Sequence, residues 1–249
     1  MAQAQENHKH VNQAVYVLHT YPFKETSLVV ELFSQQYGRI AAVAKGARRP
    51  HSAMRGMLQS FQTLEGAWSG KNELKTLHSL EWSTGLTLLK GEALMCGFYM
   101  NELLLRLLPR EDAHVNLFSY YQSTLKILAE STDFTTNIAT NMATTLRRFE
   151  LKLLQEMGYA VPLLIDENDA DIEANKTYQY EAEYGACKVN ATKVGIPLLG
   201  KTMLDMACDD YADATTQSQS KQLMRYLLAH YLGDKPLHTR QLLIDLQEF

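Results

Sequence analysis

The chain has 249 residues, of which 46% are hydrophobic and 21% are charged, and its formal net charge is −4. This composition is ordinary for a soluble globular protein with one large or two small domains. Charges interrupt the apolar runs every few residues, and the polar start of the chain lacks the apolar core of a signal peptide, so we expect a cytoplasmic protein without a membrane-spanning segment.

The net charge conceals an asymmetry along the chain. The first 85 residues contain nine Lys and Arg against six Asp and Glu, whereas the remainder contains 15 against 22. A mildly basic first third on an acidic remainder indicates that the two parts meet different partners.

The first third is predicted to form β-strands. Short runs rich in Val, Leu, Ile and aromatic residues are separated by Tyr-Pro, Tyr-Gly, Arg-Pro and Ser-Gly-Lys-Asn turn signals. The predicted strands cover residues 14–18, 27–33, 38–44, 58–68 and 73–82. So many short strands in a segment of this length favour a small antiparallel barrel of the OB type.

The pattern changes near residue 86, where apolar residues begin to recur at three and four positions. Helices are predicted over residues 86–109, 115–129, 137–157, 202–207, 218–232 and 239–248, with Gly158 as the stop of the third. Between them, residues 166–183 hold seven acids and one lysine, which indicates a loop with a short hairpin at 178–188. The expected fold class is therefore α+β. An OB-fold barrel over residues 1–85 is followed by a mostly helical domain over 86–249, with an acidic irregular insertion near 160–200.

The three cysteines, Cys96, Cys187 and Cys208, are widely spaced and form no CxxC pair. This argues against a disulfide framework and against a zinc finger. Cys96 lies in an apolar helical pattern and is predicted to be a buried thiol.

A cluster of cations follows the third predicted strand. Lys45, Arg48 and Arg49 lie in the run Val-Ala-Lys-Gly-Ala-Arg-Arg, Arg39 and Arg55 flank it, and no acid occurs between Glu31 and Glu65. A second basic loop carries Lys71 and Lys75. Such cations form either a solvated face or a site for phosphate. Gly46 and Gly56 favour the phosphate site, because glycine lets backbone approach a ligand.

Aromatic residues near these cations have two interpretations. Tyr37, Phe61 and Trp68 could stack on bases, as single-strand binding requires, or pack in the core. For Phe61 we expect core packing.

No phosphate-binding glycine loop, metalloprotease or hydrolase motif is present, and the sequence contains no convincing catalytic constellation. Asp205, Asp209, Asp210 and Asp213 form a carboxylate cluster that a metal-dependent nuclease could use, although a solvated turn is the preferred interpretation. We therefore expect no enzyme activity, no cofactor and no metal. The alternative to nucleic-acid binding is an interaction adaptor whose cations meet an acidic protein.

The sequence resembles the RecO family of bacterial recombination mediators. The similarity lies in VLHTYPFKETSLVVELFSQQYGRIAAVAKGARR, GMLQSFQTLEGAWSGKNELKTLHSLE, YMNELLLRLL, LRRFELKLLQEMGY and YLGDKPLHTRQLL, which follow the family's order and extend over nearly the whole chain. The first segment is long and specific.

The resemblance implies a non-enzymatic protein of the RecFOR pathway in DNA repair and recombination. Such a protein binds single- and double-stranded DNA, anneals complementary strands, and binds RecR and the C-terminal tail of the single-stranded-DNA-binding protein. It thereby helps RecA load at gaps, and it is expected in the cytoplasm with the nucleoid. Many relatives carry a four-cysteine zinc module that this chain lacks.

These implications assign roles to the charged residues. The expected DNA-binding set is Arg39, Lys45, Arg48, Arg49, Arg55, Lys71 and Lys75. An acidic partner tail would need cations beside an apolar groove, for which the candidates are Arg147, Arg148, Lys221 and Arg225, although each pair is also compatible with a solvated helix face.

Overall fold

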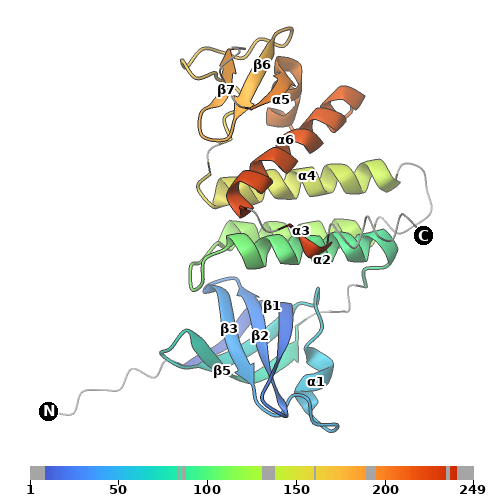
Figure 1. Ribbon diagram of the computed structural model, residues 1–249. Helices are drawn as coiled ribbons and strands as arrows, with labels where there is room; N and C mark the ends of the chain where they lie inside the picture. Colours follow the sequence, from blue (N-terminus) through green and yellow to red (C-terminus); the bar gives the residue numbers. More distant parts are fainter. Residues whose placement is uncertain are drawn as a thin grey trace, which may run out of the picture. The chain divides into compact units, whose positions relative to one another are not determined.

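The computed structural model describes residues 9–83, 85, 88–130, 138–159, 161–188, 195–233 and 236–239. Its fold is α+β, with an N-terminal closed β-barrel followed by a largely helical region, as predicted (Figure 1). The chain divides into two compact units, Met1–Asp133 with His238–Phe249, and Phe134–Leu237. The first unit thus includes helices that follow the barrel, and a domain boundary between residues 85 and 86 stays a prediction.

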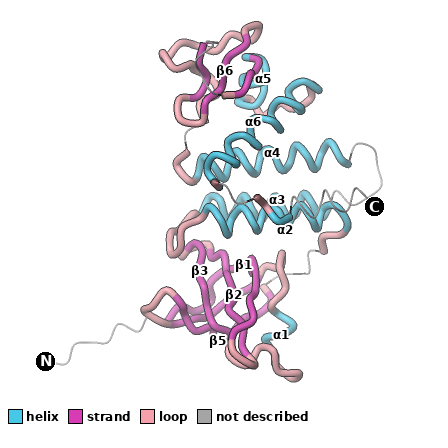
Figure 2. Tube along the Cα trace, in the orientation of Figure 1, coloured by secondary structure: helices cyan, strands magenta, loops and turns pink. Residues whose placement is uncertain are grey.

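The barrel contains five strands, and each neighbouring pair is antiparallel except for one. Figure 2 shows the barrel strands in magenta. The strands are β1 Lys9–Phe23, β2 Ser27–Ser34, β3 Gly38–Ala44, β4 Leu64–Ser69 and β5 Leu74–Trp82. Their order is β1-β2-β3-β5-β4, β3 and β5 pair in parallel, and β1 closes the barrel on β4. A barrel of this strand number and closure is the OB type.

Side chains from all five strands fill the barrel. The core includes Val15, Val17, Val30, Leu32, Ile40, Ala42, Leu64, Trp68, Leu77 and Leu80, each at most 5% exposed. Alternation along each strand sends the neighbouring residues to the outer face. The hydrophobic pattern of the first 80 residues therefore reflects a barrel with a filled interior.

A short helix, α1 Ala53–Met57, lies between β3 and β4, and the sequence pattern did not predict it. Its five residues are too few for a helical period to be visible. Met54 and Met57 pack against the barrel core together with Leu58, so this helix covers one end of the barrel.

Helices α2 Gly91–Leu107 and α3 Val115–Glu130 also belong to the first unit. Phe118 of α3 lies 5.4 Å from Tyr16 and 5.3 Å from Phe33 between ring centroids, so α3 covers part of the outer face of β1 and β2. Asn101 of α2 donates to the carbonyl of Leu18 at 2.9 Å and accepts from the Tyr121 hydroxyl at 2.6 Å. This buried bonding fixes α2 and α3 to the barrel.

The second unit combines helices with a small sheet. Its helices are α4 Ile138–Glu156, α5 Gly200–Ala207 and α6 Ala214–Leu232, and its sheet contains β6 Thr177–Glu181, β7 Gly185–Lys188 and β8 Ile196–Leu199 in the order β7-β6-β8. After α4, Gly158 adopts φ +77° and the backbone N–H of Tyr159 donates to Leu154 O at 2.9 Å. The predicted stop at Gly158 is thus confirmed.

The structure confirms most of the predicted elements and alters some boundaries. The hairpin predicted within residues 178–188 is formed by β6 and β7. The strand predicted over 58–68 begins only at Leu64, because Phe61 takes φ +68° and turns its ring toward Phe98 of α2, 5.0 Å away between centroids. The helix predicted over 239–248 lies outside the described residues except for Thr239. Among the helices that the structure describes, none is both long and apolar enough to cross a bilayer.

Candidate nucleic-acid interface

The segment Lys45–Arg49, here called the basic loop, leaves the barrel directly after β3. The backbone N–H of Arg48 donates to Thr26 O at 2.9 Å, and that of Gly46 donates to Ser27 Oγ at 3.3 Å. These bonds hold the basic loop against the turn between β1 and β2. Its cations therefore project from an ordered segment rather than from a flexible tail.

Ala47 anchors the basic loop in the barrel. Its side chain is fully buried in the core cluster, whereas Lys45, Arg48 and Arg49 on either side of it are exposed. A small apolar residue at the centre of the run thus fixes the loop, and the long side chains extend from it into solvent.

Of the two glycines near the loop, the turn requires only Gly46. Gly46 has φ +68°, a conformation that other residues rarely adopt, and the backbone N–H of Arg49 donates to its carbonyl at 3.0 Å. A Cβ on Gly46 would lie 3.6 Å from the Arg49 side chain, and a Cβ on Gly56 would meet nothing within 4 Å. Backbone conformation, and not space for a ligand, therefore explains Gly46.

Five of the predicted DNA-binding cations are exposed, namely Lys45, Arg48, Arg49, Arg55 and Lys71. In the part of the chain that the structure describes, none of them forms an ion pair with a carboxylate. Arg48 makes one polar side-chain contact, donating from its guanidinium to Lys24 O at 3.5 Å. Lys24 is itself exposed in the turn between β1 and β2, and it was not among the predicted cations because it lies outside the Lys-Gly-Ala-Arg-Arg run.

The register of the sheet separates Lys71 from the basic loop. β3 and β5 run in parallel with Ala41 opposite Leu74, so the basic loop follows the end of β3 and Lys71 precedes the start of β5. At about 3.3 Å per residue, the two loops lie roughly 20 Å apart along the strands. The two basic loops therefore do not form one continuous patch at a single end of the barrel.

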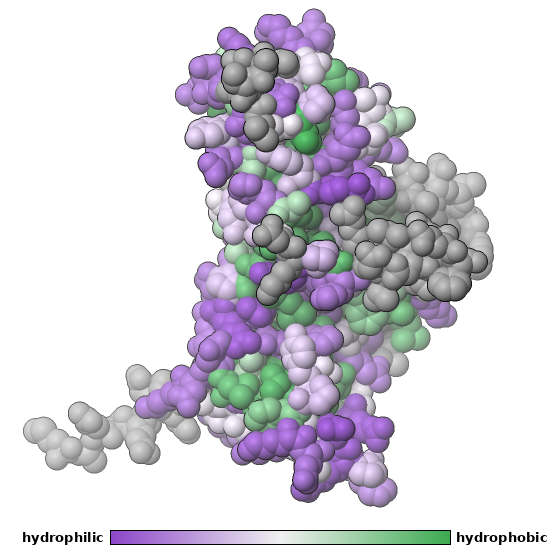
Figure 3. Space-filling model, in the orientation of Figure 1, coloured by the Kyte–Doolittle hydropathy of each residue, from purple (hydrophilic) through white to green (hydrophobic). Residues whose placement is uncertain are grey.

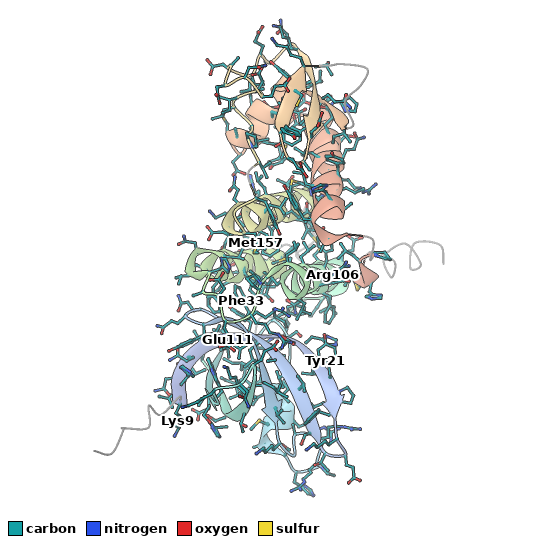
Figure 4. The ribbon with its side chains drawn as sticks, turned by 60° about the vertical axis from the view of Figure 1, so that its left-hand side comes forward. Lys9, Tyr21, Phe33, Arg106, Glu111 and Met157 are labelled. Carbon is teal, nitrogen blue, oxygen red and sulfur yellow. The ribbon has the colours of Figure 1, made fainter. Side chains whose placement is uncertain are left out.

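Arg39 and Lys75 are bound to carboxylates within the first unit. The Lys75 side chain is 7% exposed, and its Nζ lies 2.8 Å from Glu111 Oε1. Arg39 donates to Leu108 O at 3.0 Å and pairs with Glu31 at 3.5 Å. These two cations thus hold the loop between α2 and α3 on the barrel, beside Glu111 in Figure 4, and leave little charge for phosphate.

Glu31 lies at the centre of this ionic network. Its side chain is 5% exposed, and it pairs with Arg110 at 2.6 Å as well as with Arg39. Arg110 also pairs with the exposed Glu73 at 2.5 Å. Burial lowers the pKa of Arg39, and the charge of Glu31 opposes that shift.

Two of the three predicted stacking aromatics are buried. Trp68 is 1% exposed and belongs to the barrel core, whereas Phe61 is 5% exposed and packs against Phe98 of α2, so the core packing expected for Phe61 is confirmed. Tyr37 is half-buried, with its ring 5.7 Å from that of Trp68 and 4.3 Å from that of His10. The large aromatic exposed on β1 is instead Tyr21, at 45%, which was not among the predicted stacking residues.

The candidate partner-binding cations of the second unit fall into two classes. Arg147 pairs with the buried Glu150, and Arg148 pairs with Asp209 at 2.6 Å and lies over the ring of Tyr211. By contrast, Lys221 and Arg225 are both exposed at adjacent turns of α6. Of the four candidates, Arg147 and Arg148 have carboxylate partners, and Lys221 and Arg225 form no ion pair with the residues that the structure describes.

Two aspartates of the carboxylate cluster, Asp205 and Asp213, bind groups of the neighbouring helices α5 and α6. Asp213 caps α6 by accepting from the backbone N–H groups of Thr215 and Thr216 at 2.8 and 3.0 Å. These bonds, and that from Thr216 most strongly, lower the pKa of Asp213. Asp205 accepts from Thr216 Oγ1 at 2.6 Å and pairs with Lys201. Within the described ranges, no three His, Cys, Asp or Glu side chains are grouped so that they could hold a metal ion.

The cysteines are placed in different environments. Cys96 in α2 and Cys187 in β7 are buried, as predicted for Cys96, and Cys208 after α5 is exposed. Cys187 donates weakly to Gly185 O at 3.7 Å. The small sheet of the second unit thus includes a buried thiol in its hairpin.

Comparison with known proteins identifies relatives over nearly the whole chain. A family described as "Recombination protein O N terminal" matches residues 9–86, and one described as "Recombination protein O C terminal" matches residues 88–241. The chain is 51% identical over 239 residues to a protein of Nitrosospira multiformis, covering 95% of this chain and 96% of that one. It is 49% identical over 238 residues to a protein of Thiobacillus denitrificans, covering 95% and 93%. Both relatives carry the name "DNA repair protein RecO".

Proposed function

The chain belongs to the RecO family of DNA repair proteins, and from this we propose that it binds single- and double-stranded DNA through the basic loop and anneals complementary strands. The observation that supports this proposal is the exposure of Lys45, Arg48 and Arg49 on an ordered loop without carboxylate partners among the described residues. Such cations attract phosphate irrespective of base sequence.

The proposed annealing requires no bond making. Two complementary strands repel each other through their phosphates, and a surface that neutralises part of this charge raises their encounter rate. Lys24 and Arg55 would extend the basic loop at the same end of the barrel, because the loop is bonded to the turn of Lys24 and continues into α1.

A triple variant tests the proposal. With Lys45, Arg48 and Arg49 replaced by alanine, we expect weaker binding to labelled DNA in fluorescence anisotropy and a slower annealing reaction. If each side chain contacts one phosphate of a single strand, the slope of log affinity against log salt falls by about 2. The matched control replaces the exposed Lys90, Lys126 and Lys188, which changes the net charge equally but leaves the barrel intact. Equal salt slopes for the two triple variants would contradict the proposal.

In the second unit, we propose that Lys221 and Arg225 receive the acidic C-terminal tail of the single-stranded-DNA-binding protein. This contact, together with RecR, would bring the protein to gaps where RecA is to be loaded. The support is the exposure of both cations at adjacent turns of α6, whereas Arg147 and Arg148 are bound to carboxylates.

Titration of a tail peptide tests this assignment. We expect the variant with Lys221 and Arg225 replaced by alanine to bind the peptide more weakly at low salt, because two of the attracting charges are lost. The control is the Lys126→Ala, Lys188→Ala variant. If both double variants bind the peptide as the wild type does, α6 is not the site.

A further inference from the structure

The outer face of β1 consists of a covered half and an open half. Tyr16 contacts Phe118 and Tyr121 of α3, with ring centroids 5.4 and 5.0 Å apart, and is 2% exposed. Farther along the strand, His19 is exposed and Tyr21 is 45% exposed. In Figure 4, Tyr21 and Phe33 mark these two parts of the sheet, with Phe33 toward the helices.

A bulge in β1 determines which side chains face outward in the open half. The register with β2 shifts between Val17 and His19. Before the shift, the odd-numbered Val15 and Val17 belong to the core, and after it the odd-numbered His19 and Tyr21 are exposed. An extra residue in a strand reverses the alternation in this way. The bulge therefore directs an aromatic ring to solvent at a position where the preceding alternation would have buried it.

Tyr21 and His19 form a pair on this surface. Their ring centroids are 4.5 Å apart at an interplanar angle of 61°. Tyr21 lies opposite Val29 of β2, which in turn lies opposite Val43 of β3, and both valines are partly or largely buried. In Figure 3 an apolar area covers the exposed strands of the barrel, with hydrophilic residues below it. The open half of the outer face thus combines the exposed ring of Tyr21 with the apolar side chains of Val29 and Val43.

Charge is distributed unevenly around this face. Toward the start of β3, Arg39 and Arg110 are paired with Glu31, so that side is neutralised. Toward the end of β3, Lys45 follows Val43 by two residues, which is about 7 Å along a strand. Lys24 follows Tyr21 by three residues, with Glu25 as the neighbouring acid. Phosphates are therefore attracted to the end of the sheet where β3 ends and the turn between β1 and β2 lies, which is the end nearer to Tyr21.

We propose that Tyr21, supported by His19, is a stacking platform for the unpaired bases of single-stranded DNA whose phosphates are held by the basic loop. This inference rests on the proposed function and adds to it a preference for single strands, because the bases of a duplex are already stacked on each other. Aromatic rings beside a cationic groove are the usual means of sequence-tolerant binding to single strands. Burial and the nearby Glu31 raise the pKa of Tyr21 above its ordinary 10, a value at which the phenol is already neutral beside phosphate at neutral pH.

The test compares Tyr21→Ala, Tyr21→Phe and wild type on a labelled single strand and on a duplex. Loss of one stacked base weakens binding by about 5- to 140-fold, so Tyr21→Ala should lose affinity for the single strand by at least the lower factor and keep its duplex affinity. Its salt slope should equal that of wild type, because no cation is removed. Tyr21→Phe retains the ring and should bind as wild type does. Tyr184→Ala, which removes a 65% exposed tyrosine of the second unit, is the matched control.

A second measurement uses Tyr21→Trp, which should fold because the ring is at the surface. Its added fluorescence should be quenched by the single strand and not by the duplex. Unchanged single-strand affinity in Tyr21→Ala, or an equal loss for both DNA forms, would overturn the platform. If the Lys45, Arg48, Arg49 variant still binds DNA more weakly than its control, the proposed function survives that result; if that variant also binds normally, the proposed function itself fails.

Discussion

Replacing Arg110 with alanine should destabilise the first unit, because it removes the shorter ion pair of a buried carboxylate. Glu31 Oε1 lies 2.6 Å from the Arg110 guanidinium, and the Glu31 side chain is 5% exposed. The remaining partner, Arg39, is at 3.5 Å. The variant therefore leaves Glu31 buried with one long ion pair.

The size of the effect follows from this geometry. Charges about 4 Å apart at an effective dielectric constant near 20 interact by about 4 kcal/mol. The Arg110 side chain is 31% exposed, so solvent screens part of this interaction. We expect a loss of about 2 kcal/mol in the free energy of unfolding. The same guanidinium also pairs with Glu73, whose side chain is 68% exposed, and Glu73→Gln should cost less than about 0.5 kcal/mol.

The assay is urea unfolding followed by tryptophan fluorescence. The two tryptophans of the chain, Trp68 and Trp82, both lie in β4 or β5, so the signal reports on the barrel and not on the second unit. Equal destabilisation by Arg110→Ala and Glu73→Gln, or a change below about 0.5 kcal/mol in both, would refute the view that burial of Glu31 makes its pairing with Arg110 important.

Two further predictions concern contacts within the first unit. Gly38→Ala should prevent normal packing of the first unit, because Gly38 has φ +64° and an added Cβ would lie 1.7 Å from Asp112 O. The control Gly56→Ala should have the same urea midpoint as wild type within error, because its Cβ meets nothing within 4 Å. Burial alone would raise the pKa of Glu102, but hydrogen bonds from the Thr239 hydroxyl and backbone N–H outweigh it and lower the pKa below its ordinary 4.5. The ionised Glu102 therefore contributes stability that is present above pH 4.5, the ordinary pKa, and is lost as the pH falls through the lowered pKa. The difference in Tm between wild type and Glu102→Gln should accordingly be constant from pH 6 to 8 and should shrink toward pH 3.

Local pattern predicted the elements whose signals lie within one segment. β3 was predicted with its observed bounds, because a Tyr-Gly turn precedes it and the Lys-Gly run follows it. The bulge in β1 was not predictable, since it shows only in the register with β2. As a result, the exposure of Tyr21 could not be inferred from alternation.

The charged residues show the same limit. Lys75 was expected on a DNA-binding surface, but the structure gives it Glu111 as a partner from the loop between α2 and α3. Arg110 was not singled out, although it joins Glu31 and Glu73, which are far from it in the sequence. The run of cations in the basic loop was recognisable because all its members are neighbours, whereas neutralisation by distant carboxylates depends on the tertiary fold.

The contact of Glu102 with the segment at His238 and Thr239 has a consequence for synthesis on the ribosome. Glu102 accepts from residues 136 and 137 positions later in the chain, and the whole second unit is made between them. At roughly 5 to 20 residues per second, Glu102 waits about 7 to 27 s for its partners after it is translated. We therefore expect the nascent first unit to remain incomplete while the second unit folds, so that chain elongation, and not strand pairing, sets when this contact forms.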